Sequence, residues 1–276
     1  MSASSNAYRK AARQLAQKTA NSRTARAAIA AADGNQIIER SIIGSFKLPG
    51  TLIAPPVFRS IFQSPVEGVK MQGLRVMAKS LDAFRMVASY IASKPSLLAS
   101  GSLQVQRSRI VPTAKGLHRS LSGAFAAGDL DTLRRVCHSN LYQTLSTKIL
   151  QRPAGVRKEW ELISYTGTLM YPRIVDHKIM EVPLRDGSKV TVHQAVVTIR
   201  SRQRLTQFND KTGESTGPSK ELDVTEHLIM LRELDPNGSP PGDWKVFGYA
   251  DETTYQDWLK EKHGLDLLMK QAKAQR

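Results

Sequence analysis

One dipeptide and its surroundings hold the side chains best suited to covalent chemistry. Cys137, the only cysteine, precedes His138, and a thiol beside an imidazole is the pairing that activates a nucleophilic thiolate. Apolar residues recur three and four apart through AAGDLDTLRRVCHSNLYQTL, which predicts one helix from Asp129, its N-cap, to Arg152. On that helix Cys137 falls in the buried apolar stripe, while His138 points about 100° away. The pair therefore predicts a buried thiol without a catalytic role.

Enzyme and cofactor motifs are absent from the sequence. It contains no HExxH, GxGxxG, GxxxxGK[ST] or GxSxG pattern, and its six histidines lack metal-ligand spacing. Asp176 and His177 are neighbours whose side chains point to opposite faces of a predicted strand. We therefore expect no catalytic residue, no metal, no cofactor and no small-molecule substrate. A cone-shaped isomerase or dehydratase, with an acid–base pair at the mouth of the cone, is the weakest of the alternatives.

Cationic side chains are the remaining candidates for function. In TIRSRQRL, Arg200, Arg202 and Arg204 point to one face of a predicted strand at intervals of about 6.6 Å. Such a row can follow a phosphate backbone, or it can form exposed ion pairs with Glu221 and Asp223 of the next strand. The sequence does not decide between these two. The full set of candidates for contact with rRNA or anionic lipid is Arg75, Lys79, Arg85, Arg107, Arg109, Lys115, Arg200, Arg202 and Arg204.

Charge is distributed unevenly along the 276 residues, whose net charge is +16. Residues 1–116 hold 17 Lys and Arg against four acids, whereas residues 117–276 are nearly neutral. The first 32 residues contain six basic residues and no acid among Ala, Ser and Thr, a composition typical of a mitochondrial transit peptide, which we assign to residues 1–35. A single cysteine is in keeping with a reducing compartment. The sequence therefore predicts a basic arm that contacts a polyanion.

The arm is expected to continue as an extended connector over residues 36–71. Pro49, Pro55, Pro56 and Pro65 interrupt this stretch, and prolines at this density disfavour a continuous helix or a central strand. No uncharged run approaches the roughly 20 apolar residues that cross a bilayer. We expect the folded domain to occupy residues 72–276.

The first helix of that domain, Gln72–Lys94, is predicted to be amphipathic. Its apolar residues are spaced three and four apart and form one stripe: Leu74, Met77, Leu81, Phe84, Ala88 and Ile91. The stripe can pack on the domain itself, the commoner situation and the one we favour, or lie in a membrane interface with cations toward the headgroups.

The rest of the chain predicts an α+β fold, with helices packed on a curved antiparallel sheet. We expect a loop over residues 95–112 and a helix over Thr113–Ala127 that ends at Gly128. The period then changes to two, which predicts strands at residues 161–170, 175–182, 189–205, 222–234 and 244–250 in an antiparallel meander. A last helix, Thr253–Lys273, begins with Thr253 and Gln256 in capping-box spacing.

This order of segments resembles a known family. A basic presequence, a proline-rich connector, an amphipathic helix, AFAAGDLDTLRRVCHSNLYQTL, five strands and the closing DWKVFGYADE are similar to the mitochondrial inner-membrane ribosome receptor of fungi. They also resemble its animal counterpart, a large-subunit mitoribosomal protein. Both share a cone-shaped domain, similar to nuclear transport factor two, with the matrix arm of the presequence translocase. The resemblance covers roughly residues 70–255.

The resemblance implies a structural role in mitochondrial translation. Such proteins lie on the matrix side of the inner membrane and hold the peptide exit of the large ribosomal subunit there for co-translational insertion. The implied partners are the large subunit, through rRNA and proteins near the exit, anionic lipids of the inner membrane, and the membrane insertase. A peripheral tether subunit of the import motor is the alternative, weakened because the chain lacks a long charged N-terminal region for recruiting chaperones.

Overall fold

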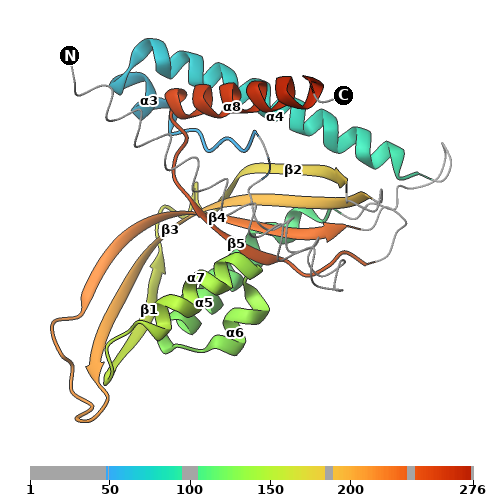
Figure 1. Ribbon diagram of the computed structural model, residues 1–276. Helices are drawn as coiled ribbons and strands as arrows, with labels where there is room; N and C mark the ends of the chain where they lie inside the picture. Colours follow the sequence, from blue (N-terminus) through green and yellow to red (C-terminus); the bar gives the residue numbers. More distant parts are fainter. Residues whose placement is uncertain (1–47, 49, 95–104, 184–188, 235–239, 275–276) are drawn as a thin grey trace, which may run out of the picture. The chain divides into compact units, whose positions relative to one another are not determined.

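A five-stranded antiparallel sheet lies at the centre of the fold (Figure 1). The computed structural model describes residue 48 and residues 50–94, 105–183, 189–234 and 240–274. The predicted transit peptide lies outside the described residues. The strands are β1 (Val156–Tyr165), β2 (Arg173–Pro183), β3 (Lys189–Asn209), β4 (Lys220–Leu234) and β5 (Lys245–Ala250). The α+β class is thereby confirmed.

The sheet departs from a simple meander at its first strand. Strands β2 to β5 follow one another as neighbours, but β1 pairs with β3 and not with β2. The two share one edge of β3: its first half, up to Thr198, pairs with β2, and its second half, from Ser201, pairs with β1. Pairing along the other edge of β3 is with β4. The prediction failed here because β3, at 21 residues, is long enough to carry two strands end to end.

Three helices cover one face of the sheet, namely α5 (Arg107–Ala127), α6 (Leu130–Val136) and α7 (Ser139–Leu150). Buried side chains of α5 and α6, with partly buried ones of α7, meet alternate residues of β3 and β4 in the main core. The opposite face is covered in part by the chain segment before α3, whose Ile53 packs on Val196 and Ile229. Every residue of β3 from Thr191 to Ile199 is therefore buried.

A second group of helices comprises α3 (Val57–Gln63), α4 (Pro65–Ala92) and α8 (Tyr255–Ala274), with α4 contacting α3, α8 and β2 (Figure 1). The extended connector expected up to residue 71 is thus wrong over residues 57–63 and 65–71. Pro56 is the N-cap of α3 and Pro65 the first residue of α4, positions where a missing N–H breaks no helical hydrogen bond. The boundary between connector and domain stays a prediction.

The helix predicted from Asp129 to Arg152 is broken at the Cys137–His138 pair. Cys137 has extended backbone angles and forms a parallel bridge with Val246 of β5, and the His138 N–H donates to the Val246 carbonyl, 2.8 Å away. This tertiary pairing overrides a local helical pattern that has no breaker residue. Two details are confirmed: Cys137 is buried, and Asp129 caps α6 by accepting from the Thr132 N–H at 3.0 Å.

Two helix starts also differ from expectation. Helix α5 begins at Arg107, within the expected loop, and contains Pro112. Helix α8 begins one residue after Thr254, whose hydroxyl accepts from the Asp257 N–H, while Thr253 bonds instead to the backbone of Ile53. Gly128 ends α5 in the left-handed conformation, as predicted. Among the described helices, none combines the length and the hydropathy needed to cross a bilayer.

Candidate functional site

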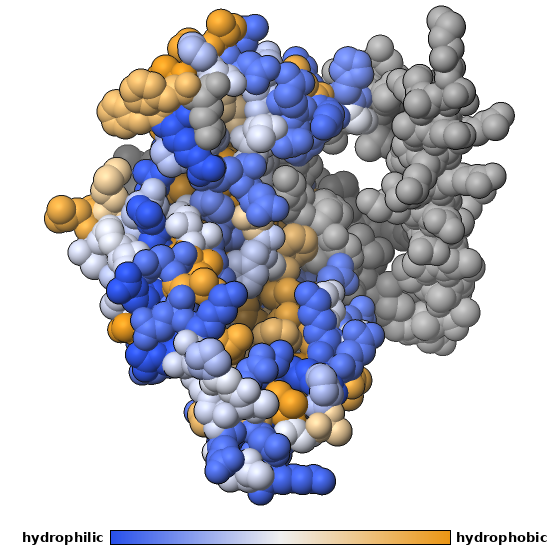
Figure 2. Space-filling view, turned by 90° about the vertical axis from the view of Figure 1, so that its left-hand side faces the viewer, coloured by the Kyte–Doolittle hydropathy of each residue, from blue (hydrophilic) through white to orange (hydrophobic). Residues whose placement is uncertain are grey.

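Helix α4 turns most of its apolar residues to solvent. With two phenylalanines of α3 these form what we call the apolar ridge, each side chain more than half exposed: Phe58, Phe62, Val66, Val69, Val76, Met77, Phe84, Val87 and Ile91. At 100° per residue, the seven ridge residues of α4 fall within an arc of about 100°. Figure 2 shows hydrophobic residues gathered at the top of the molecule, where Figure 1 places α3 and α4.

The opposite side of α4 faces the sheet and mixes apolar and polar residues: Met71 is buried, and Met86 packs on a small apolar cluster of the sheet. Asp82 is buried, and Arg75 and Lys79 lie beside β2, where burial first and neighbouring cations second lower the pKa of both side chains. The favoured sequence interpretation, an apolar stripe packed on the domain, is therefore wrong. A helix of globular proteins normally buries its main apolar face, so the exposed ridge marks α4 as a candidate surface for contact with something apolar.

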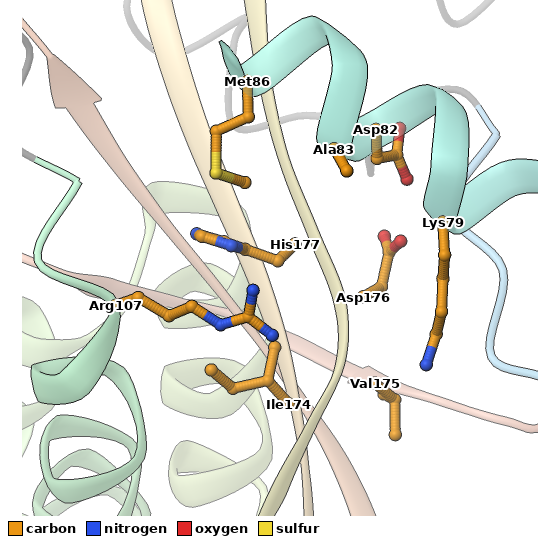
Figure 3. A pocket seen from close by; sticks show the side chains of 9 residues that line it. All are labelled: Lys79, Asp82, Ala83, Met86, Arg107, Ile174, Val175, Asp176 and His177. Carbon is orange, nitrogen blue, oxygen red and sulfur yellow. The ribbon is translucent and has the colours of Figure 1, made fainter. Parts of the chain in front are cut away.

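A small cavity of about 120 Å³ lies between α4, β2 and the start of α5 (Figure 3). Figure 3 shows Asp82 and Asp176 pointing toward each other across it, with Lys79 beside them and Arg107 reaching in from α5. Lys178 forms an ion pair with each carboxylate, with Nζ 3.6 Å from Asp82 and 3.3 Å from Asp176. Burial raises the pKa of Asp176 to about 6, although the charge of Lys178 opposes this shift.

Three of the predicted cations therefore come together. Arg75, Lys79 and Arg107 lie close enough to affect one another's ionisation or that of a common neighbour, and Arg173 of β2 joins them. The other candidates lie apart from this group. Arg85 points to solvent 4.0 Å from Asp82, Arg109 is exposed on α5, and Lys115 sits 4.3 Å above the Tyr165 ring.

The arginine row of β3 mainly serves cross-strand pairing. Arg202 binds both carboxylate oxygens of Asp223 at 3.0 and 2.8 Å, and Arg204 bridges Glu221 and Glu161. The ion-pair interpretation thus holds for these two residues. Arg200 is exposed and its guanidinium carbon lies 5.2 Å from the centre of the Tyr171 ring. Contact of the row with a polyanion stays a prediction.

A buried polar string inside the helix-covered side of the sheet was missed by sequence reasoning. His118 of α5 is fully buried, with Nε2 2.8 Å from a carboxylate oxygen of Glu226, which also accepts from Gln203 at 2.8 Å. The Trp160 indole N–H donates to Gln203 in turn. Because His118 and Glu226 are 108 residues apart, only the fold brings them together.

This histidine–glutamate pair is the arrangement that an acid–base enzyme in the cone would require, and the ionisation of its carboxyl group disfavours Glu226 as the base. Burial opposes ionisation of Glu226, but the hydrogen bonds and charge of His118 outweigh it and lower the pKa of the carboxyl. A carboxylate made less basic is a poor general base. Cys137 is no better as a nucleophile, since burial raises the pKa of its thiol to about 12.

No candidate metal centre accompanies these groups. The residues that the structure describes hold no cluster of three or more His, Cys, Asp or Glu side chains. The histidines instead pair with polar neighbours: His177 and His193 contact each other through Nε2, and His227 bonds to Thr198. Burial lowers the pKa of His177 to about 4 and that of His193 to about 2.

Comparisons with known proteins identify the family. A crystal structure of the intermembrane space region of the chloroplast protein ARC6 is 11% identical, covers 53% of this chain and 95% of that chain, and gives a TM-score of 0.31. No curated protein matches the sequence. The family model described as MBA1-like protein matches residues 102–262, more than half of the chain. The chain therefore belongs to the MBA1-like protein family, whose namesake is a mitochondrial ribosome-associated membrane protein.

Proposed function

We propose that this protein holds the mitochondrial large ribosomal subunit against the matrix face of the inner membrane, as a subunit or as a membrane receptor. The apolar ridge lies in the lipid interface, and cations of the same chain bind rRNA or lipid phosphate. Nascent membrane proteins then emerge next to the bilayer, where the insertase receives them. The observation that carries the proposal is the exposed apolar ridge on α3 and α4.

The ridge suits a lipid interface better than it suits water. Burying one phenylalanine side chain is worth about 1.5–3 kcal/mol, and the ridge offers three phenylalanines on two consecutive helices. Polar groups flank it: Lys70 and Arg85 are exposed on the same helix, and anionic headgroups attract such cations by about 1 kcal/mol each. A helix of this kind lies in the plane of the membrane surface.

Vesicle flotation tests the membrane part of the proposal. The full-length protein is mixed with phosphatidylcholine vesicles that contain cardiolipin, and the bound fraction is compared with that of Phe62→Ser combined with Phe84→Ser. We expect each substitution to weaken vesicle binding at least about tenfold, since each removes a ring that the lipid interface would bury. The matched control is Leu150→Ser combined with Leu169→Ser, which removes two exposed apolar side chains outside the ridge. An equal loss of vesicle binding in the ridge variant and the control variant would show that the ridge is not the membrane-binding surface.

Sedimentation tests the ribosomal part. Mitochondrial lysate is centrifuged through a sucrose gradient at low and at high salt, and the protein is followed across the fractions. We expect it to migrate with the large subunit at low salt and to dissociate as salt screens its cationic contacts. Absence from the large-subunit fractions at low salt would refute the ribosomal role. Crosslinks to the import channel and its matrix chaperone would then support the import-motor alternative.

A further inference from the structure

A second and larger cavity, of about 520 Å³, lies between the sheet and the helices that cover it. Its volume falls within the range of about 300–1,000 Å³ that is typical of small-molecule sites. Its walls come from α5, α7 and four strands, and they are mainly apolar: Leu121, Phe125, Leu145, Leu205 and the rings of Trp160 and Tyr249. Neither the apolar ridge nor the small cavity beside α4 contributes a residue to it. A site here is therefore separate from the surfaces assigned above.

Cations from different elements line the same cavity. Lys148 comes from α7 and Lys158 from β1, and neither forms an ion pair with a carboxylate of the described residues. Arg152 is fixed in place, because its guanidinium donates to the Phe125 and Ala126 carbonyls and stacks on the Phe125 ring. Two lysines without carboxylate partners thus stand beside an apolar interior.

The single carboxylate among the lining residues does not balance these charges. Glu226 already accepts hydrogen bonds from His118 and Gln203 through one oxygen, and Gln203 is itself held by Trp160. The lysines therefore lack an internal counter-ion, while the apolar walls lack a packing partner. One molecule that carries both a negative head and a hydrocarbon body satisfies both.

We propose that this cavity binds a single-chain anionic amphiphile, with its chain between α5 and the sheet and its carboxylate or phosphate head at Lys148 and Lys158. A charged hydrogen bond to each lysine is the stronger kind of head-group contact. Neutral amphiphiles of the same chain length bind less tightly, because they leave both ammonium groups unpaired. The inference goes beyond the tethering function and does not depend on it.

Calorimetric titration of the full-length, delipidated protein tests the inference with three ten-carbon probes, the anions kept below their micelle concentrations and decanol below its solubility limit. Decanoate and decyl phosphate distinguish the two head groups, and decanol is the neutral reference. We expect saturable binding of at least one anion. The affinity for decanol should be lower than that for the anion by about tenfold or more. Lys148→Gln combined with Lys158→Gln should weaken anion binding about tenfold or more and leave decanol unchanged. Lys211→Gln combined with Lys220→Gln removes the same charge from exposed positions outside the cavity and should change neither.

Two further variants locate the chain. Leu205→Trp fills the cavity and should abolish binding, whereas Leu222→Trp, on the neighbouring strand and outside the lining, should not. Thermal unfolding of both variants checks that each is folded. A decanoate brominated at its last carbon should quench the tryptophan fluorescence of the wild-type protein. Trp160→Phe should remove the quenching that is due to Trp160, the tryptophan that lines the cavity.

The competing outcomes are clear-cut. Absence of saturable binding, equal effects of the two tryptophan substitutions, or equal affinity for decanol and the anions would each overturn the inference. Phe62→Ser combined with Phe84→Ser should leave anion binding intact. If that ridge variant instead lost both vesicle and decanoate binding, the amphiphile would belong to the ridge and not to the cavity. If the ridge variant lost vesicle binding but kept decanoate binding, the result would support the ridge as the membrane surface and leave the cavity as the amphiphile site.

Discussion

Lys178 of β2 and Asp82 of α4 form a buried ion pair that joins the amphipathic helix to the sheet, with Nζ 3.6 Å from Oδ2. The same ammonium group lies 3.3 Å from Asp176 and donates to the Gly50 carbonyl at 2.8 Å. One lysine side chain, 3% exposed, thus fastens α4, β2 and the segment before α3 together. Together with the buried Met71 of α4, this contact fixes which side of the helix faces the sheet.

Replacing Lys178 by methionine should lower the free energy of unfolding by about 3–5 kcal/mol. The substitution keeps most of the length of the side chain but removes the buried cation that pairs with both carboxylates, and leaves them only the more exposed Arg85 and Lys79. Chemical denaturation at pH 7 measures the change. Lys220→Met, at an exposed position, should alter stability by no more than about 0.5 kcal/mol. Similar values for both variants would show that the buried pair contributes nothing beyond packing.

Asp176 should make the protein less stable as pH rises from about 4 to about 6. Its folded pKa of about 6 exceeds its ordinary value of 3.8, so in this window the folded state binds the proton and the unfolded state does not. The expected decrease is up to about 3 kcal/mol and is complete above pH 6. His177 and His193 act in the opposite direction, because their lowered pKa values cost stability below pH 6.5.

The difference between wild type and Asp176→Asn isolates the aspartate. Denaturation curves at several pH values should show the variant gaining stability relative to wild type as pH rises through this window, while the histidine contributions cancel. The nearby charges of Asp82 and Lys178 are present in both proteins. A difference that stays constant from pH 4 to pH 7 would mean that Asp176 ionises normally.

Gly68 should tolerate no side chain, whereas Gly73 on the same helix should accept one. A Cβ at Gly68 would lie 2.5 Å from the carbonyl oxygen of Ser60, so α3 and α4 would have to separate. A Cβ at Gly73 would meet nothing within 4 Å. We expect Gly68→Ala to destabilise by about 1–3 kcal/mol and Gly73→Ala to stabilise by about 0.5–1 kcal/mol, measured by thermal unfolding. Matching effects would contradict the close packing of the two helices.

The sequence predicted the elements of the fold better than their connections. Alternation and turn residues located four of the five strands closely, whereas the first, predicted at residues 161–170, lies at 156–165. Glycine, which adopts the left-handed conformation freely, marked the end of α5 at Gly128. The sequence could not predict that β1 and β2 share one edge of β3, since strand pairing is a tertiary property. The break at Cys137 has the same origin: the bond from His138 to Val246 joins residues more than 100 apart.

The candidate sites were predictable only in part. The apolar stripe of α4 was evident from its spacing, but its direction was not, because periodicity defines a face without saying what covers it. Arg202 and Arg204 pair with Asp223 and Glu221, the carboxylates that the predicted hairpin places opposite them. The string from His118 to Trp160 had no local signal, because its members come from three strands and a helix.

The segment that precedes α3 sets a limit on maturation of the chain. Leu48 is fully buried and its amide bonds to Gln194, Thr51 accepts from the same side chain, and Ile53 exchanges hydrogen bonds with Thr253. Leu48 and residues 50–53 thus cover part of the outer face of β3. A peptidase that trims the N-terminus must cut before Leu48, or the mature protein would lose part of its own core.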